Sequence, residues 1–315
     1  DVRSRVVKGM FDVVSTLPVV SPVTESRLEY DLVRLITRVA WPERPVVGLM
    51  TSLPGVLGEP MNQMMMMQGQ RPQPGWAAFT ELSKDYEVRE ISPTAESIDS
   101  DVKALVILHA KDLSEKTLFA IDQFVIKGGR LIACVDPFSV MDMLASRQQQ
   151  NPMMMQMGGG GQDGPSTLGK LFDAWGVTFD TSKLVADLSA ATKLNDGTGR
   201  AEDNPAFLTL GTANMDEGDL LMSGLSQLMM PFAGSFSFDA KDKDLKFEPV
   251  LMTSKSNSCM VDAMTLKFGG GIKDLAQSKT AGNITVFPGI QGDGSDTICL
   301  ETAEKFVRFR KFVAL

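Results

Sequence analysis

The pattern of hydrophobic and polar positions in residues 103–137 predicts a strand, a helix and a second strand. Residues 104–108 (ALVIL) and 131–135 (LIACV) are short continuous apolar runs, typical of strands buried on both faces. Between them, apolar residues recur at helical spacing at Leu118, Ile121, Phe124 and Val125. Ser114 is a suitable N-cap, and the glycines at 128–129 end the helix. A unit of this length predicts a right-handed βαβ crossover, and therefore a parallel sheet covered by helices.

Similar patterns predict further elements on both sides of this unit. We expect a helix that begins at Thr24 or Ser26 and ends before 41–45, with the apolar stripe Leu28, Leu32, Leu35, Ile36 and Val39. Other predicted helices cover 76–82 and 167–175, and predicted strands cover 46–50 and 86–91. Shorter apolar runs predict strands at 177–179, 184–187, 206–210, 236–238, 247–252, 284–287 and 297–300. The sequence leaves open whether the last of these extend the first sheet or form a second one.

The order of elements predicts an α/β fold: a mainly parallel sheet flanked by helices, with flavodoxin-like layering and a smaller β-rich C-terminal region. We divide the chain into a lead-in segment and helix at 1–40, an α/β core domain at 41–190 and a β-rich α+β region at 191–315.

Two insertions, 61–75 and 147–164, are too biased in Met, Gln, Gly and Pro to be regular elements. Each follows the carboxyl end of a predicted parallel strand, so both are expected over the same edge of the sheet. Three roles are open for their Met clusters, 64–67 and 153–157: copper(I) binding through thioethers, an adaptable apolar contact surface, or a low-complexity loop. Neither cluster is accompanied by His or Cys, which weakens the copper alternative.

The carboxyl ends of the parallel strands carry the candidate ligand-binding residues, because ligands of such sheets bind at that edge. These residues are Ser52, Gly55, His109, Lys111, Asp136 and Phe138. For His109 the alternative is a loop histidine bonded to nearby backbone, and for Asp136 a turn residue that precedes Pro137.

Composition narrows the classes of function. The formal net charge is −8, and no basic stripe with interleaved aromatic residues is present, so we expect no nucleic-acid partner. No apolar run reaches the roughly 20 residues that span a bilayer. The sequence starts at Asp1 without a Met or a signal peptide, which we interpret as the soluble part of a longer protein.

The cysteines and glycine runs predict no metal site, cofactor or catalytic centre. The spacing of the three cysteines fits no zinc motif, and a disulfide between Cys259 and Cys299 is compatible with the sequence but not required by it. Cys134 lies inside an apolar strand rather than on the strand-to-helix turn that a nucleophile needs, so we expect a buried small hydrophobe. The runs GGGG (158–161) and GGG (269–271) lack the Lys and Ser/Thr of a P-loop.

A series of short segments resembles the soluble domain of GldG-type proteins, the gliding-motility family of ABC-transporter auxiliary components. The segments are 28–32 (LEYDL), 44–49 (RPVVGL), 86–89 (YEVR), 120–125 (AIDQFV), 128–131 (GGRL), 135–137 (VDP), Leu168, Leu171, 175–177 (WGV), 185–187 (VAD) and, more loosely, 249–254 (PVLMTS). They come in the family's order over roughly residues 25–255. The Met-rich insertions depart from the family's pattern.

The resemblance implies an extracytoplasmic, periplasmic domain, tethered to the inner membrane by helices outside this sequence. Its partners would be the permease and ATPase subunits of an ABC transporter, with an envelope protein or a small polar ligand as a further possibility. Its core would be similar to the class I glutamine amidotransferase-like fold. We therefore predict a non-catalytic binding or scaffold module without a cofactor. The alternatives are a divergent hydrolase on the same fold and a copper(I)-handling protein.

Overall fold

The structure is a computed structural model that describes most of the 315-residue chain. The described residues are 6–8, 14–16, 25–40, 43–58, 74–149, 164–195, 201–216, 218–219, 222, 224–239, 246–254, 256–264, 285–291 and 297–301. The Met clusters at 64–67 and 153–157 lie outside them, so the three roles considered for these clusters stay predictions.

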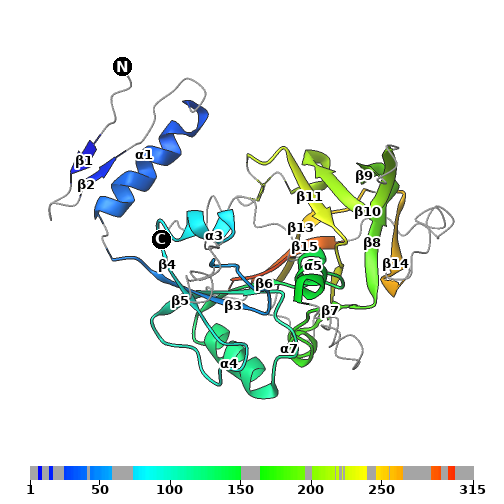
Figure 1. Cartoon of the computed structure of the whole chain (residues 1–315), viewed down its shortest axis with the longest axis horizontal. Helices are drawn as coiled ribbons and strands as arrows, with labels where there is room; N and C mark the ends of the chain where they lie inside the picture. The colour runs from blue at the N-terminus through cyan, green and yellow to red at the C-terminus, as the bar shows by residue number, and fades with distance from the viewer. Residues whose placement is uncertain are drawn as a thin grey trace.

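A mainly parallel sheet forms the centre of the molecule (Figure 1), and seven described strands build it in the order β13-β15-β16-β6-β5-β3-β4. Strands β4, β3, β5, β6 and β16 run parallel, and β15 and β13 add to them in antiparallel pairs. The strands are β3 (Val46–Thr51), β4 (Glu87–Glu90), β5 (Val102–Leu108), β6 (Arg130–Cys134), β13 (Lys246–Met252), β15 (Thr285–Gln291) and β16 (Thr297–Glu301). The α/β fold with a mainly parallel sheet is thus confirmed.

The unit β5–α4–β6 has the structure that its sequence predicts. Helix α4 (Glu115–Ile126) has Ser114 as its N-cap, and the Ser114 hydroxyl accepts the backbone N–H of Thr117 at 3.1 Å. Beyond its end, Gly128 has a φ of +86°, a conformation that favours glycine. The other α-helices are α1 (Glu25–Ala40), α3 (Ala77–Leu82), α5 (Val140–Gln149) and α7 (Lys170–Trp175).

Alternate residues of the central strands face two different layers. Val106 and Ile132 belong to a cluster that includes Phe79 of α3 and residues of the β-rich region. Leu105 and Leu131 belong to the opposite cluster, with residues of α4 and α7. Because side chains alternate along a strand, the continuous apolar runs of the sequence supply both layers at once. Figure 1 shows α4 and α7 on one side of the sheet.

The β-rich region resolves the question that the sequence left open: β13, β15 and β16 extend the first sheet, and other strands form separate sheets. Those strands are β7 (Val177–Phe179), β8 (Lys183–Asp187), β9 (Ala191–Asn195), β10 (Ala201–Gly211), β11 (Gln227–Pro231), β12 (Phe236–Phe238) and β14 (Ser258–Asp262). They pair as β11-β10-β9, β12-β7 and β14-β8. Short 3-10 helices cover Leu188–Ala190 and Thr212–Asn214. The proposed boundary at residue 191 stays a prediction.

One buried carboxylate connects this region to the end of β13. The Asp187 side chain is fully buried, and its Oδ2 accepts the backbone N–H and the hydroxyl of Ser254, both at 2.7 Å. Its Oδ1 accepts the N–H of Ser189 at 2.8 Å. Asp187 and Ser254 lie in two of the segments that carry the family resemblance, so both segments serve the same structural contact.

Two sequence-based boundaries are wrong. Helix α5 continues to Gln149, so the second biased segment does not begin at residue 147. Helix α7 begins at Lys170 rather than Thr167, because Gly169 has a φ of +46° that is not helical. No helix among the described residues is long and apolar enough to cross a membrane.

Two glycines that end helices differ in the space around them, which allows a matched test. Gly176 ends α7 with a φ of +74°, and a Cβ there would lie 2.3 Å from the carbonyl oxygen of Asp239. Gly128 has a φ of +86° with nothing within 4 Å of the same position. We predict that Gly128→Ala lowers the free energy of unfolding by about 1 kcal/mol, from backbone strain alone. Gly176→Ala should lower it by about 2–4 kcal/mol, since the backbone must also move.

The measurement is equilibrium urea unfolding of the two variants and the parent protein. Equal losses of unfolding free energy in Gly176→Ala and Gly128→Ala would show that the loop at Asp239 moves at little cost. That result would contradict the close packing against Gly176.

Candidate functional site

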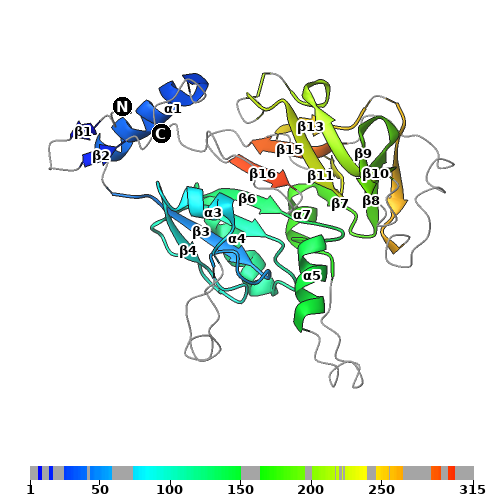
Figure 2. The ribbon, with the colours of Figure 1, turned by 45° about the horizontal axis from the view of Figure 1, so that its top comes forward.

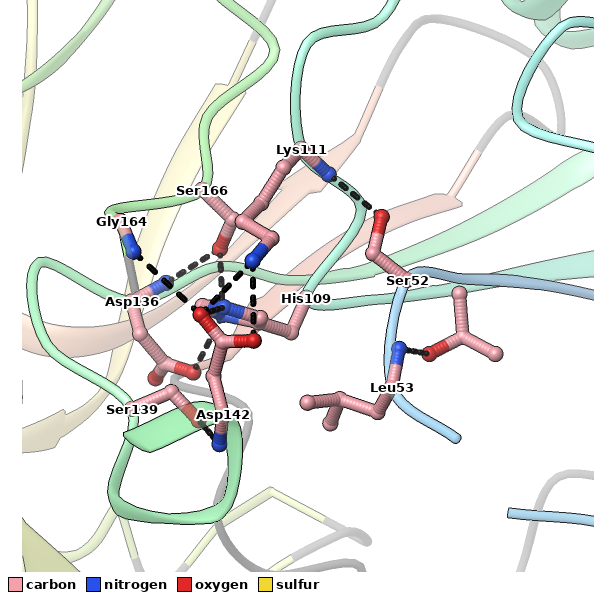
Figure 3. A network of polar contacts seen from close by, with 10 residues as sticks. Ser52, Leu53, His109, Lys111, Asp136, Ser139, Asp142, Gly164 and Ser166 are labelled. Carbon is pink, nitrogen blue, oxygen red and sulfur yellow. Dashed lines mark hydrogen bonds and ion pairs between the residues drawn. The ribbon is translucent and has the colours of Figure 1, made fainter. Parts of the chain in front are cut away.

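A polar cluster lies where strands β3, β5 and β6 end, at the same edge of the sheet (Figure 3). Ser52 follows β3, His109 and Lys111 follow β5, and Asp136 follows β6. The parallel ladder continues one step past β5, because the His109 N–H donates to the Cys134 carbonyl at 2.8 Å. The segment after β5 is thereby held against the neighbouring strand end.

His109 is the central residue of the cluster and is fully buried. Its Nδ1 lies 3.2 Å from Asp136 Oδ2 and 3.1 Å from Ser166 Oγ. Since an ionised carboxylate only accepts hydrogen bonds, the contact with Asp136 requires the proton on Nδ1. His109 has a φ of +45°, an uncommon conformation for a residue other than glycine. The contacts of the ring compensate the strain of this backbone.

Asp136 and Ser166 form a reciprocal pair that connects β6 to the segment before α7. The backbone N–H of Asp136 donates to Ser166 Oγ at 2.9 Å, and the backbone N–H of Ser166 donates to the Asp136 carbonyl at 2.8 Å. Both side chains are buried. The segment at 164–168 is therefore fixed to the strand end by backbone and side chain together.

Asp142 joins the remaining parts of the cluster. Lys111 Nζ lies 2.8 Å from both carboxylate oxygens of Asp142, and the Gly164 N–H donates to Oδ2 at 3.3 Å. Asp142 lies in the first turn of α5, where the helix dipole favours negative charge, and its own N–H donates to Ser139 Oγ at 3.2 Å. The backbone N–H of Lys111 donates to Ser52 Oγ at 2.9 Å, which adds the end of β3.

One atom of this cluster has no hydrogen-bond partner in the part of the chain that the structure describes. It is Nε2 of His109, which is buried and lies 3.5 Å from Asp142 Oδ2. An imidazole nitrogen buried between charged groups without a hydrogen bond is unfavourable.

The cluster contains Ser, His and Asp but differs from a catalytic triad. In a triad the carboxylate binds Nδ1 of the histidine and the nucleophile lies at Nε2. Here Asp136 and Ser166 both contact Nδ1, and Nε2 faces Asp142. Cys134 is fully buried inside β6, as its apolar surroundings in the sequence predict. No group of three or more His, Cys, Asp or Glu side chains suited to a metal ion occurs among the described residues.

Four of the six candidate residues from the sequence come together in the cluster: Ser52, His109, Lys111 and Asp136. Gly55 lies further along the turn after β3, where its carbonyl accepts the N–H of Gly58. Phe138 packs edge-to-face on Phe232, with ring centroids 5.4 Å apart. It therefore joins the strand end to the β-rich region and not to the polar cluster.

Sequence reasoning missed Ser139, Asp142, Gly164 and Ser166. The first two had a local signal, because Ser-x-x-Asp is the pattern of a helix N-terminus. Gly164 and Ser166 had none, since long-range folding alone brings them to His109. Gly164 is the last residue of the second insertion, so that insertion ends at the cluster. Gly58 and Pro74, which form an isolated antiparallel bridge, lie just before the first insertion and near its end.

Comparison with known proteins assigns the chain to a family. Residues 44–293 match the family described as "ABC-type uncharacterized transport system", an auxiliary component of such systems. The chain belongs to this family. The match covers all strands of the central sheet except β16, together with the strands of the β-rich region, and it confirms the coarser part of the resemblance, the link to ABC-type transport.

The similar proteins found are distant. Over 249 residues the chain is 23% identical to an uncharacterized protein of Borreliella burgdorferi, and the alignment covers 76% of this chain and 43% of that protein. The chain thus spans less than half the length of this relative. Among solved structures, the mmIFT52 N-terminal domain has a TM-score of 0.44 at 8% identity, covering 82% of this chain and 86% of that one. A ThuA-like protein from Bacteroides uniformis has a TM-score of 0.38 at 9% identity, with coverage of 85% and 86%. Both likenesses are too weak to support an inference about this chain.

The ion pair between Lys111 and Asp142 is shielded from solvent, which allows a prediction about its energy. The exposed fractions of the two side chains are 20% and 7%. In a double-mutant cycle with Lys111→Met and Asp142→Asn, we predict a coupling free energy of about 1–3 kcal/mol in urea unfolding. Either single substitution should be more destabilising than the pair together, since it leaves a partly buried group without its partner.

The matched control is the pair Lys116 and Glu96, whose side chains are 71% and 66% exposed. The cycle with Lys116→Met and Glu96→Gln should give about 0–1 kcal/mol. The same coupling for both pairs would mean that the cluster is open to water.

Proposed function

We propose that this protein is a non-catalytic module of an ABC-type transport system, working as a scaffold that recognises a partner through its surface. In this proposal it is a GldG-type component with an amidotransferase-like core, placed on the periplasmic side of the inner membrane. Helices outside this sequence tether it, and its partners are the permease and ATPase subunits. Membership of the auxiliary family supports the transport role. The finer points rest on the sequence resemblance.

The observation that carries the scaffold role is the way the polar groups of the cluster bind one another. Both carboxylate oxygens of Asp142 accept hydrogen bonds from Lys111 Nζ, and the carboxylate of Asp136 is bonded to the His109 ring. A nucleophile at Nε2 of His109, as a triad needs, is absent from the described residues. These contacts instead fix α5 and the segment at 164–168 to three strand ends.

A rigid edge of this kind suits surface recognition. Helix α5, anchored by Asp142, exposes the apolar side chains of Met141 (39%) and Leu144 (45%). Methionine and leucine supply adaptable apolar contact area, as interfaces require. We therefore place the partner-binding surface on α5, beside the strand ends.

The test is site-specific photocrosslinking in the native cells, with the full-length protein carrying a photoreactive amino acid at Met141 or at Leu144. After detergent solubilisation, mass spectrometry identifies the captured proteins. We expect a permease or ATPase of an ABC transporter from both positions. Matched controls are Phe119 and Ile126, which are 63% and 64% exposed on α4. They should capture no transporter subunit.

Two results would contradict the proposal in different ways. Capture of transporter subunits only from Phe119 or Ile126 would move the surface to α4. Capture of soluble or envelope proteins alone, from all four positions, would overturn the transport role.

A small polar ligand at the strand ends is a second candidate function, and one observation favours it. Nε2 of His109 is a buried polar atom that the described residues leave without a hydrogen bond, and a ligand oxygen could supply one. The predicted site of Ser52, Gly55, His109, Lys111, Asp136 and Phe138 would then include Asp142. Access would require the ion pair of Lys111 and Asp142 to open.

Thermal-shift screening with a library of small polar compounds tests this candidate. A true ligand should raise the melting temperature of the parent protein and lose that effect in His109→Ala and in Asp136→Ala. A control substitution, Asp101→Asn, removes an exposed carboxylate elsewhere on the surface and should leave the shift intact. An unchanged shift in His109→Ala and Asp136→Ala would exclude this site.

A further inference from the structure

Helix α1 lies at one end of the molecule, beside the hairpin formed by β1 (Val6–Lys8) and β2 (Val14–Thr16), in both Figure 1 and Figure 2. Its main packing partners among the described elements are these two strands. Leu35 and Val39 are its buried apolar residues, and neither belongs to the two large apolar clusters of the core. The buried apolar side chains of α1 are thus not part of the two apolar clusters that cover the sheet.

Two arginines of α1 make described hydrogen bonds and ion pairs with the core. Arg34 Nη1 lies 2.7 Å from Glu81 Oε1, and Arg34 Nη2 donates to the Glu81 carbonyl at 3.3 Å. Arg34 and Arg38 both pair with the carboxylate of Asp85. Glu81 belongs to α3, and Asp85 follows it just before β4. We call these four residues the α1–α3 clasp.

Asp85 is the centre of the α1–α3 clasp, because one carboxylate receives two guanidinium groups from successive turns of α1. The exposed fractions of the Arg34 and Asp85 side chains are 18% and 20%, so water screens this pair only partly. Burial alone would lower the pKa of Arg34, but its hydrogen bonds with Asp85 and Glu81 outweigh this and raise it. The guanidinium is thus charged whenever the clasp is closed.

Contacts between charged groups respond to salt in a way that apolar contacts do not. The Debye length falls from about 10 Å at 0.1 M ionic strength to about 3 Å at 1 M. Apolar packing is not weakened by this change. High salt should therefore weaken the α1–α3 clasp, while the two core clusters stay intact.

We propose that the α1–α3 clasp is a releasable joint, which docks helix α1 on the core and frees it when the charges of Asp85 are screened or removed. The joint determines where α1 points relative to the sheet. It lies outside the strand-end cluster, and its two arginines precede residue 44, where the family match begins. The proposal is independent of the transport role.

The experiment measures the distance between α1 and the core by pulsed electron paramagnetic resonance. Spin-labelled amino acids are introduced at Glu29 of α1 and at Lys103 of β5, two exposed positions, so the native cysteines are left in place. At about 0.05 M salt the parent protein should give one narrow distance distribution, which broadens as the salt approaches about 1 M. Asp85→Asn should give the broad distribution at every salt concentration.

The matched control is Asp101→Asn, which removes another carboxylate paired with an arginine, Arg89, at 3.0 Å. It should behave like the parent protein. If Asp85→Asn does not fold, the salt series on the parent protein tests the proposal by itself. A narrow distribution in Asp85→Asn, or one in the parent protein that does not change with salt while circular dichroism shows a folded core, would overturn the proposal.

Discussion

The carboxylate of Asp142 is the interaction on which the arrangement of the strand-end edge depends. It accepts Lys111 through both oxygens and the Gly164 N–H through one of them, and it lies 3.5 Å from the imidazole of His109. It thus connects the loop after β5, the first turn of α5 and the end of the second insertion. Without it, three segments far apart in sequence would each need another attachment, and Lys111 would be left without its counter-charge.

This constraint bears directly on function. Polar groups at the carboxyl ends of a parallel sheet are where such folds bind ligands or carry out chemistry. In this protein the groups at that edge mainly bind one another, and the order of contacts around His109 differs from that of a triad. Their effect is mechanical: they hold α5 and its exposed apolar side chains beside the strand ends. That effect fits the proposed role, in which the auxiliary component recognises a partner through its surface.

Much of the fold was predictable because local secondary-structure preference and tertiary packing favour the same structure in the unit β5–α4–β6. The runs ALVIL and LIACV are apolar at every position, and the structure uses alternate residues of both for the two opposite layers. Strands β1, β2, β9, β11 and β14 were missed, because each is short and mixes polar with apolar residues, and antiparallel pairing with another strand defines it. Four site residues were predictable from strand ends alone. Ser166 was not, because folding brings it to His109 across 57 positions of the sequence.

The most direct test of this account uses the fact that His109 is the chain's single histidine. A nitrogen–proton correlation spectrum of the imidazole reports which nitrogen carries the proton and how fast it exchanges with water. The account predicts a proton on Nδ1 that exchanges slowly, and its loss of protection in Asp136→Ala. A proton mainly on Nε2, or rapid exchange in the parent protein, would mean that the ring is open to solvent. Either result would contradict a polar cluster at the strand ends that is closed to solvent.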